Sequence, residues 1–188
     1  MQTGLRLNRD GTERLEYVEH GLPVRAVDGK LSYFQQYAAA CHWHYDFEWL
    51  QATEGEMDYF VNGEIVHIGE GQAIFVNSCR LHYGFSAERE ECVFRTFLFH
   101  PSLLGEMPLP TAAYTARLAA DGQRDWYLLD PVRDSAMLRE MDVIFDRCTA
   151  KPELFEFDVQ AACGRLIALT YQALTPDAAA EPVNDPAW

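Results

Sequence analysis

The stretch His42-Trp43-His44-Tyr45-Asp46-Phe47-Glu48 decides how the rest of this sequence is interpreted. Side chains alternate between the two faces of a β-strand, so residues 42, 44 and 48 would share one face, and Asp46 has the same parity. Imidazole and carboxylate groups are ligands for first-row transition metals. A further histidine, His82, lies within a second block at residues 71–86. The open question is whether His42, His44, Glu48 and His82 hold a metal, a small organic ligand or nothing.

Length, composition and charge set limits on the answer. The chain has 188 residues, of which 48% are hydrophobic, enough for one globular domain or one domain with an appendage. The net charge is −14, which opposes binding of nucleic-acid phosphates by these residues themselves. We find no apolar run of about 20 residues and no secretory signal, so we expect no membrane span and a cytoplasmic protein.

The five cysteines are odd in number and form no CxxC pair. We therefore expect free thiols in a reducing compartment. Cys41 adjoins His42, but its strand parity directs it to the other face, so we predict that Cys41, Cys148 and Cys163 are buried and do not bind a metal.

The middle of the chain has the pattern of short strands separated by turns. Asn62-Gly63 is the strongest hairpin signal and predicts a type I′ turn. We also expect β-structure at residues 31–37 and a last strand at 126–129. The spacing favours a sandwich or barrel. The main predicted strands are residues 47–53, 56–61, 64–68, 72–76, 81–85 and 92–99.

The last third of the chain changes to helical patterns. Residues 111–120 are alanine-rich, and Asp130 with Pro131 predicts the start of a second helix. An antiparallel helical hairpin is expected, with a tail that resembles a linker. Each helix of the hairpin has one apolar stripe. The first consists of Met137, Met141, Ile144, Phe145 and Cys148, and the second of Phe155, Val159, Ala162, Cys163 and Leu166.

Two blocks of this sequence resemble the motifs of the cupin superfamily. The first is H-x-H-x3-E-x6-G from His42 to Gly55, and the second is G-x5-N-x-C-x2-H-x3-S from Gly71 to Ser86. Asn77, Cys79 and Ser86 depart from the usual second motif, which affects its turn rather than its ligands. The resemblance implies a mainly β fold, a double-stranded β-helix (jelly-roll) barrel, with three histidines and one glutamate at its mouth.

The chemistry of these four residues suits a divalent transition metal such as Zn, Ni, Fe or Mn. Equivalent residues in ligand-binding cupins can instead line a metal-free pocket, where histidine donates and accepts hydrogen bonds. Asp46 is expected to be solvated or capping, His20 and His67 to be ordinary surface or strand residues, and His100 to cap a short helix.

A closer resemblance covers residues 30–174. The strings GQAIFVNS at 71–78 and FHPSLL at 99–104 are similar to the effector-binding domain of AraC-family transcription regulators. The resemblance implies a barrel over residues 1–129, a dimerising helical hairpin over 130–175 and a linker-like tail over 176–188. The family's basic helix-turn-helix region does not occur in the tail, so we expect either a chain cut at the linker or a stand-alone sensor.

The leading hypothesis is a small-molecule sensor and not an enzyme. A sugar or organic acid would bind in the barrel and signal through a homodimer formed by residues 131–174 to a DNA-binding domain absent from this chain. The rival is a metal-dependent cupin dioxygenase, isomerase or decarboxylase; a barrel without a ligand ranks last because buried ionisable groups are costly. Candidate ligand-binding residues are Arg80, Arg95, Tyr33, Tyr59 and Tyr83.

Overall fold

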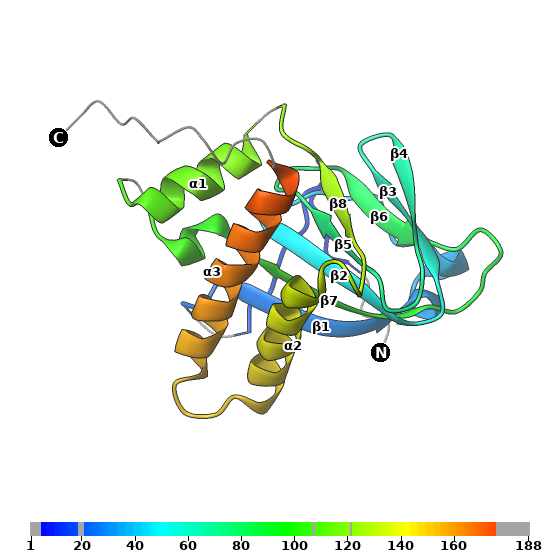
Figure 1. Cartoon of the computed structure of the whole chain (residues 1–188). Helices are drawn as coiled ribbons and strands as arrows, with labels where there is room; N and C mark the ends of the chain where they lie inside the picture. Colours follow the sequence, from blue (N-terminus) through cyan, green and yellow to red (C-terminus); the bar gives the residue numbers. More distant parts are fainter. Residues whose placement is uncertain (1–4, 19–20, 107, 121, 176–188) are drawn as a thin grey trace.

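The computed structural model describes residues 5–18, 21–106, 108–120 and 122–175. A helix pair, α2 (Ser135–Ala150) and α3 (Phe155–Leu174), covers one face of a five-stranded sheet, and a three-stranded sheet lies beyond its other face (Figure 1). The predicted fold class, a mainly β cupin barrel followed by two helices, is confirmed.

All paired strands run antiparallel, in the orders β1-β7-β2-β5-β8 and β4-β3-β6. The predicted turn between β3 and β4 is present, because Asn62 and Gly63 both have positive φ angles, of 46° and 100°, as a type I′ turn requires. The strands are β1 (Val24–Lys30), β2 (Phe47–Glu54), β3 (Met57–Val61), β4 (Glu64–Ile68), β5 (Ala73–Val76), β6 (His82–Phe85), β7 (Val93–Phe99) and β8 (Trp126–Leu129).

The five-stranded sheet separates two hydrophobic cores. Leu50 of β2 and Phe94 of β7 belong to the core between the sheets, together with Met57 of β3. Trp49 and Phe97 of the same two strands belong to the core beneath the helices. Alternation along a strand therefore gives β2 and β7 one face in the barrel and one face against the helix pair.

The helices follow the predicted apolar stripes. All ten stripe residues of α2 and α3 are buried. The remaining helical elements are α1 (Pro110–Ala119) and the short 3-10 helices η1 (Leu31–Tyr33), η2 (Gln35–Tyr37) and η3 (Pro101–Leu104).

Two local predictions are wrong. The helix after Asp130 begins only at Ser135, because the Asp130 carboxylate accepts the N–H groups of Val132 and Arg133 at 2.9 and 3.0 Å and closes a turn instead. Residues 31–37 form two 3-10 turns rather than a strand, since Gln36 has a φ angle of 58° that a strand cannot contain.

The described cysteines are all free. Cys148 and Cys163 are buried as predicted, whereas Cys41 is exposed, so its prediction as a buried thiol is wrong; it lies between the isolated bridges at residues 38 and 42. His20 and the tail at residues 176–188 lie outside the described residues. Within the described part of the chain, no helix has the length and apolar character needed to cross a membrane.

Candidate metal and ligand site

Four predicted residues meet inside the barrel. One potential ligand atom from each of His42, His44, Glu48 and His82 lies within 4.8 Å of the others, and all four side chains are buried. Strand parity is only part of the reason, because β2 begins at Phe47. The segment before it is held by an isolated antiparallel bridge between residues 42 and 82, which brings the two motif blocks together.

Backbone carbonyls fix the orientation of the three imidazole rings. The Nδ1 atoms of His42, His44 and His82 lie 2.9, 3.1 and 2.7 Å from the carbonyl oxygens of Ala40, Asp46 and Arg80. A carbonyl only accepts, so each Nδ1 must carry the proton. The three Nε2 atoms are left for the centre of the cluster, which is the arrangement that orients histidines in metal sites.

Glu48 lies at the centre of the cluster. Its Oε2 is 2.9 Å from His44 Nε2 and 3.2 Å from His82 Nε2, and its Oε1 accepts the Tyr59 hydroxyl at 2.8 Å. Burial opposes ionisation of Glu48, but His82 and His44 outweigh it and hold its pKa well below the usual range. The Glu48 carboxylate can only accept hydrogen bonds, so these short distances to His44 Nε2 and His82 Nε2 require either protons on both nitrogens or a cation between them and the carboxylate.

The histidines differ in protonation. Burial and then the charge of His82 lower the pKa of His42 to about 3, so this ring is neutral. Burial also disfavours charge on His44, but its hydrogen bond to Glu48 outweighs burial and raises the pKa of His44.

The donor set fits a divalent first-row metal. Three imidazole nitrogens and one carboxylate are the donors that Zn, Ni, Fe and Mn accept, and these atoms lie within 4.8 Å of one another. His42, His44, Glu48 and His82 would hold the ion, which would act there as a Lewis acid toward a bound molecule.

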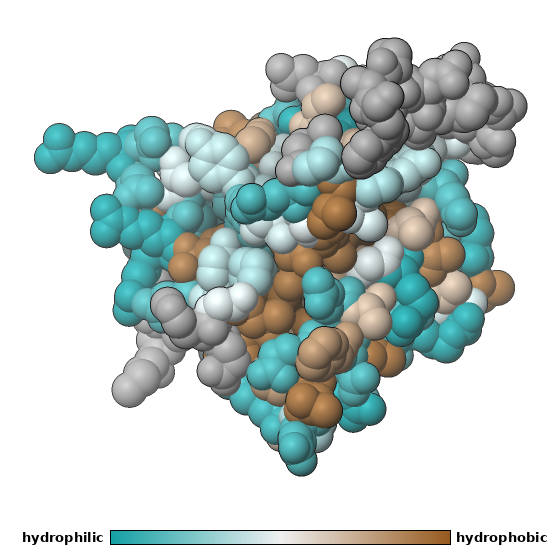
Figure 2. Space-filling model, turned by 90° about the vertical axis from the view of Figure 1, so that its left-hand side faces the viewer, coloured by the Kyte–Doolittle hydropathy of each residue, from teal (hydrophilic) through white to brown (hydrophobic). Residues whose placement is uncertain are grey.

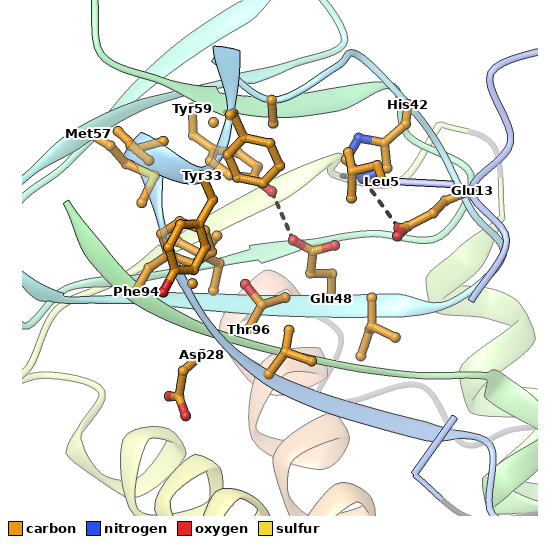
Figure 3. Close-up of a pocket in the computed structure, with 18 of the residues that line it drawn as sticks. Leu5, Glu13, Asp28, Tyr33, His42, Glu48, Met57, Tyr59, Phe94 and Thr96 are labelled. Carbon is orange, nitrogen blue, oxygen red and sulfur yellow. Dashed lines mark hydrogen bonds and ion pairs between the residues drawn. The ribbon is translucent and has the colours of Figure 1, made fainter. Parts of the chain in front are cut away.

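A cavity of about 210 Å³ adjoins the cluster. Glu48 and His42 belong to its lining, and Figure 3 shows Tyr59, Thr96 and Phe94 around the same space. Tyr33 reaches it from η1 and Glu13 from the N-terminal segment. The cavity and the cluster therefore form one continuous site.

The proposed ligand-binding residues divide into two groups. Tyr33 and Tyr59 line the cavity, but Tyr83 packs against Phe60 and Phe85 outside it. Arg80 forms an ion pair with Asp125, and it donates to the carbonyl oxygens of Ser78 and Ala120. Arg95 lies on the helix side of the sheet, bonded to Gln51 and Asp142. The structure does not bring these two arginines or Tyr83 to the cavity.

Other polar predictions have mixed outcomes. His100 accepts the Ser102 N–H and caps η3 as predicted, and His67 is exposed on β4. Asp46, predicted to be solvated or capping, is only 3% exposed, accepts the Tyr17 hydroxyl at 3.1 Å and precedes a strand rather than a helix, so that prediction is wrong.

Sequence reasoning missed Glu13 and Thr96. Glu13 is 8% exposed and its Oε2 lies 3.6 Å from His42 Nε2; burial raises its pKa, although Arg25 opposes this. It reaches the site because residues 12 and 43 form a bridge, a contact with no local sequence signal. Thr96 had a detectable signal, because alternation along β7 places it on the same face as Phe94 and Leu98.

This combination of antiparallel barrel and buried His-His-Glu-His cluster defines a cupin-type binding domain. Residues 26–147 match the model of the AraC-like ligand binding domain, and the chain belongs to that family. A comparison with curated proteins gives no match.

Three solved structures illustrate the similarity of the fold. ToxT from Vibrio cholerae, crystallised with an unsaturated fatty acid, has a TM-score of 0.48 and 9% identity over 81% of this chain and 54% of that chain. An RmlC-like cupin from Shewanella frigidimarina has a TM-score of 0.37 and 18% identity over 43% of this chain and 68% of that one. A predicted oxalate decarboxylase from Thermotoga maritima has a TM-score of 0.32 and 23% identity over 34% of this chain and 56% of that one.

A Streptococcus pyogenes protein of unknown function has a TM-score of 0.32 and 16% identity. The match covers 34% of this chain and 54% of that one. This chain therefore matches only about half of the length of several of these structures. All TM-scores are below 0.5, so the assignment rests on the family model.

Proposed function

We propose that this chain is the small-molecule sensing domain of an AraC-type transcription regulator. An effector binds in the barrel cavity, beside a divalent metal held by His42, His44, Glu48 and His82. Binding changes how the barrel holds the helix pair, and a homodimer formed through residues 131–174 passes the change to a DNA-binding unit. The proposed sensor has three parts: the barrel at residues 1–129, the helical hairpin at 130–175 and the linker at 176–188.

One observation carries the proposal: the cavity and the helix pair share the same two strands. Glu48 and Leu50 of β2 and Thr96 of β7 line the cavity. Trp49 of β2 and Phe97 of β7 pack into the helix-side core. A ligand that shifts either strand also shifts the surface on which α2 lies, which gives the differential contact that coupling between two states needs.

Polar contacts support a direct connection between sheet and helix. Arg95 of β7 donates from Nε and Nη2 to Gln51 of β2 at 2.9 and 2.7 Å and forms an ion pair with Asp142 of α2. Its guanidinium also lies 4.8 Å from the ring centre of Phe145. The candidate ligand residue Arg95 is therefore better suited to joining the barrel to α2.

The net charge of −14 supports assigning DNA contacts to a unit other than these residues. Metal binding is supported by the buried donor set, because one potential ligand atom from each of three histidines and one glutamate lies within 4.8 Å of the others.

The test is a thermal-shift screen of small molecules on metal-loaded protein, followed by sedimentation with and without the hit. A sensor is expected to gain stability with one chemical class of ligand and to change its dimerisation constant, without converting the ligand. Gain of stability with no change in association would contradict the signalling part of the proposal.

The second candidate is a metal-dependent cupin enzyme, favoured by the three-histidine, one-glutamate set beside a cavity. Oxygen uptake or product formation by the Fe- or Mn-loaded chain, absent from a Glu48→Gln variant, would favour this candidate over the sensor.

A further inference from the structure

The barrel cavity has two chemically different ends, and they restrict what it can bind. Figure 3 shows Met57 and Phe94 at one end and His42 with Glu13 at the other, with Glu48 and Thr96 between them. Most apolar side chains of the lining lie toward the Met57–Phe94 end, and Glu13, His42 and Glu48 lie toward the other, although Leu5 lies beside His42 and Asp28 lies near Phe94.

The apolar end is built for a flat ring. Aromatic side chains and a thioether prefer to contact aromatic guests through ring edges and ring faces. The cavity measures about 210 Å³, whereas an apolar cavity of about 150 Å³ already accepts benzene. One six-membered ring with a small substituent therefore fits. The apolar wall consists of Leu31, Tyr33, Phe34, Leu50, Met57 and Phe94.

The polar end favours a group that donates a hydrogen bond. Glu13 and Glu48 are buried carboxylates, and the one arginine of the lining, Arg25, lies 3.5 Å from Glu13. A ligand carboxylate placed here would be repelled by both carboxylates, and Arg25 is already paired with Glu13. Among the described residues, the Thr96 hydroxyl has no hydrogen-bond partner, so it is free to bind a ligand's polar group.

We infer that the effector cavity accepts a single-ring phenol, with its ring at the Met57–Phe94 end and its hydroxyl beside Thr96 and Glu48. A phenol hydroxyl donates to a carboxylate, and its oxygen is also a ligand type that divalent metals accept. A sugar fits poorly, because the apolar wall leaves several of its hydroxyls without partners. This inference rests on the proposed function and narrows its effector to one chemical class.

The experiment is calorimetric titration of the full chain, zinc-loaded and zinc-free, with phenol, benzoate, benzylamine, cyclohexanol and glucose. We expect phenol to bind at one site in both states, at least about tenfold more tightly than the other four probes. Two matched variants locate the site: Tyr33→Ala removes a cavity wall, and Tyr45→Ala removes a tyrosine that is 56% exposed and outside the cavity lining.

Tyr33→Ala is expected to weaken phenol binding about fivefold or more, and Tyr45→Ala to leave it unchanged. Because Tyr33 is itself 42% exposed, its loss leaves the fold intact. The isosteric variant Thr96→Val tests the hydroxyl: it should weaken phenol about fivefold while leaving toluene binding unchanged.

Tighter binding of benzoate, benzylamine or glucose than of phenol would overturn the phenol assignment and leave the sensor proposal standing. Equal loss of phenol binding in both tyrosine variants would overturn the location. Conversion of phenol by the metal-loaded chain would instead contradict the sensor function while keeping the ligand class.

Discussion

Glu48 and Trp49 are consecutive residues of β2 that act on opposite sides of one sheet. Glu48 lies in the barrel, bonded to His44 and Tyr59, and is 4% exposed. The Trp49 ring stacks on Phe97 with a centroid distance of 5.1 Å in the core beneath the helix pair. One peptide unit therefore separates the candidate metal centre from the helix layer.

Zinc is expected to stabilise the chain strongly. Free metal at a hundredfold excess over Kd adds about 2.7 kcal/mol to the free energy of unfolding, which raises Tm by roughly 5–10 °C for a domain of this size. Removal of the metal by a chelator should reverse the shift in differential scanning calorimetry.

Variants of the cluster separate specific from surface binding of zinc. His82→Ala should abolish the zinc-dependent rise in Tm, because it removes one of four converging donors. His67→Ala is the matched control, since His67 is an exposed histidine of β4. An equal loss in both variants would contradict a metal site at the cluster.

Arg95 and Asp142 should be energetically coupled. Both belong to one contact between β7 and α2, but the Asp142 side chain is 55% exposed, so solvent screens the pair. A double-mutant cycle with Arg95→Met and Asp142→Asn is expected to give a coupling free energy of about 0.5–1 kcal/mol by denaturant unfolding. Additive effects would show that α2 is held on the sheet by apolar packing alone.

The local parts of this fold could be predicted because their signals are local. The Asn62-Gly63 turn and the buried stripe at Met137, Met141 and Ile144 follow from turn chemistry and helical period. The four residues of the cluster could be named from their spacing and from the resemblance to two cupin blocks, although the bridge between residues 42 and 82 that joins them is a long-range contact.

The roles of the arginines could not be predicted from spacing. Arg80 and Arg95 are near motif residues in sequence, but their partners, Asp125 and Asp142, come from segments far along the chain. Glu13 is likewise brought to His42 from the N-terminal segment. The positive φ angles of Gln36 and Tyr37 break the predicted strand, and neither residue type signals a left-handed conformation.

Thiol labelling should distinguish two groups of cysteines. Cys41 and Cys79 are exposed, whereas Cys92, Cys148 and Cys163 are buried. Burial also raises the pKa of Cys92 to about 12 and of Cys148 to about 11, so little reactive thiolate forms at either. Two thiols should react with a chromogenic disulfide in the native chain, and all five after unfolding; Cys41→Ser and Cys79→Ser should each remove one native reaction.

The helix pair leaves an apolar surface that a second copy of the chain is expected to cover. Figure 2 shows apolar side chains around a hollow on the side of the molecule where α1 and α3 lie. Phe157 of α3 is 70% exposed and lines a cavity with Leu22, Pro23 and Leu103. Exposed aromatic residues beside pockets are typical anchors of protein interfaces.

Phe157→Asp should therefore weaken self-association at least about tenfold, which corresponds to about 1.4 kcal/mol, while leaving Tm of the monomer nearly unchanged. Ile65→Asp is the matched control, because Ile65 is 64% exposed on β4 of the three-stranded sheet. Sedimentation equilibrium at tens of micromolar measures both. If Ile65→Asp disrupts the dimer and Phe157→Asp does not, the interface lies on the barrel. Coupling through α2 could then not act by way of dimerisation.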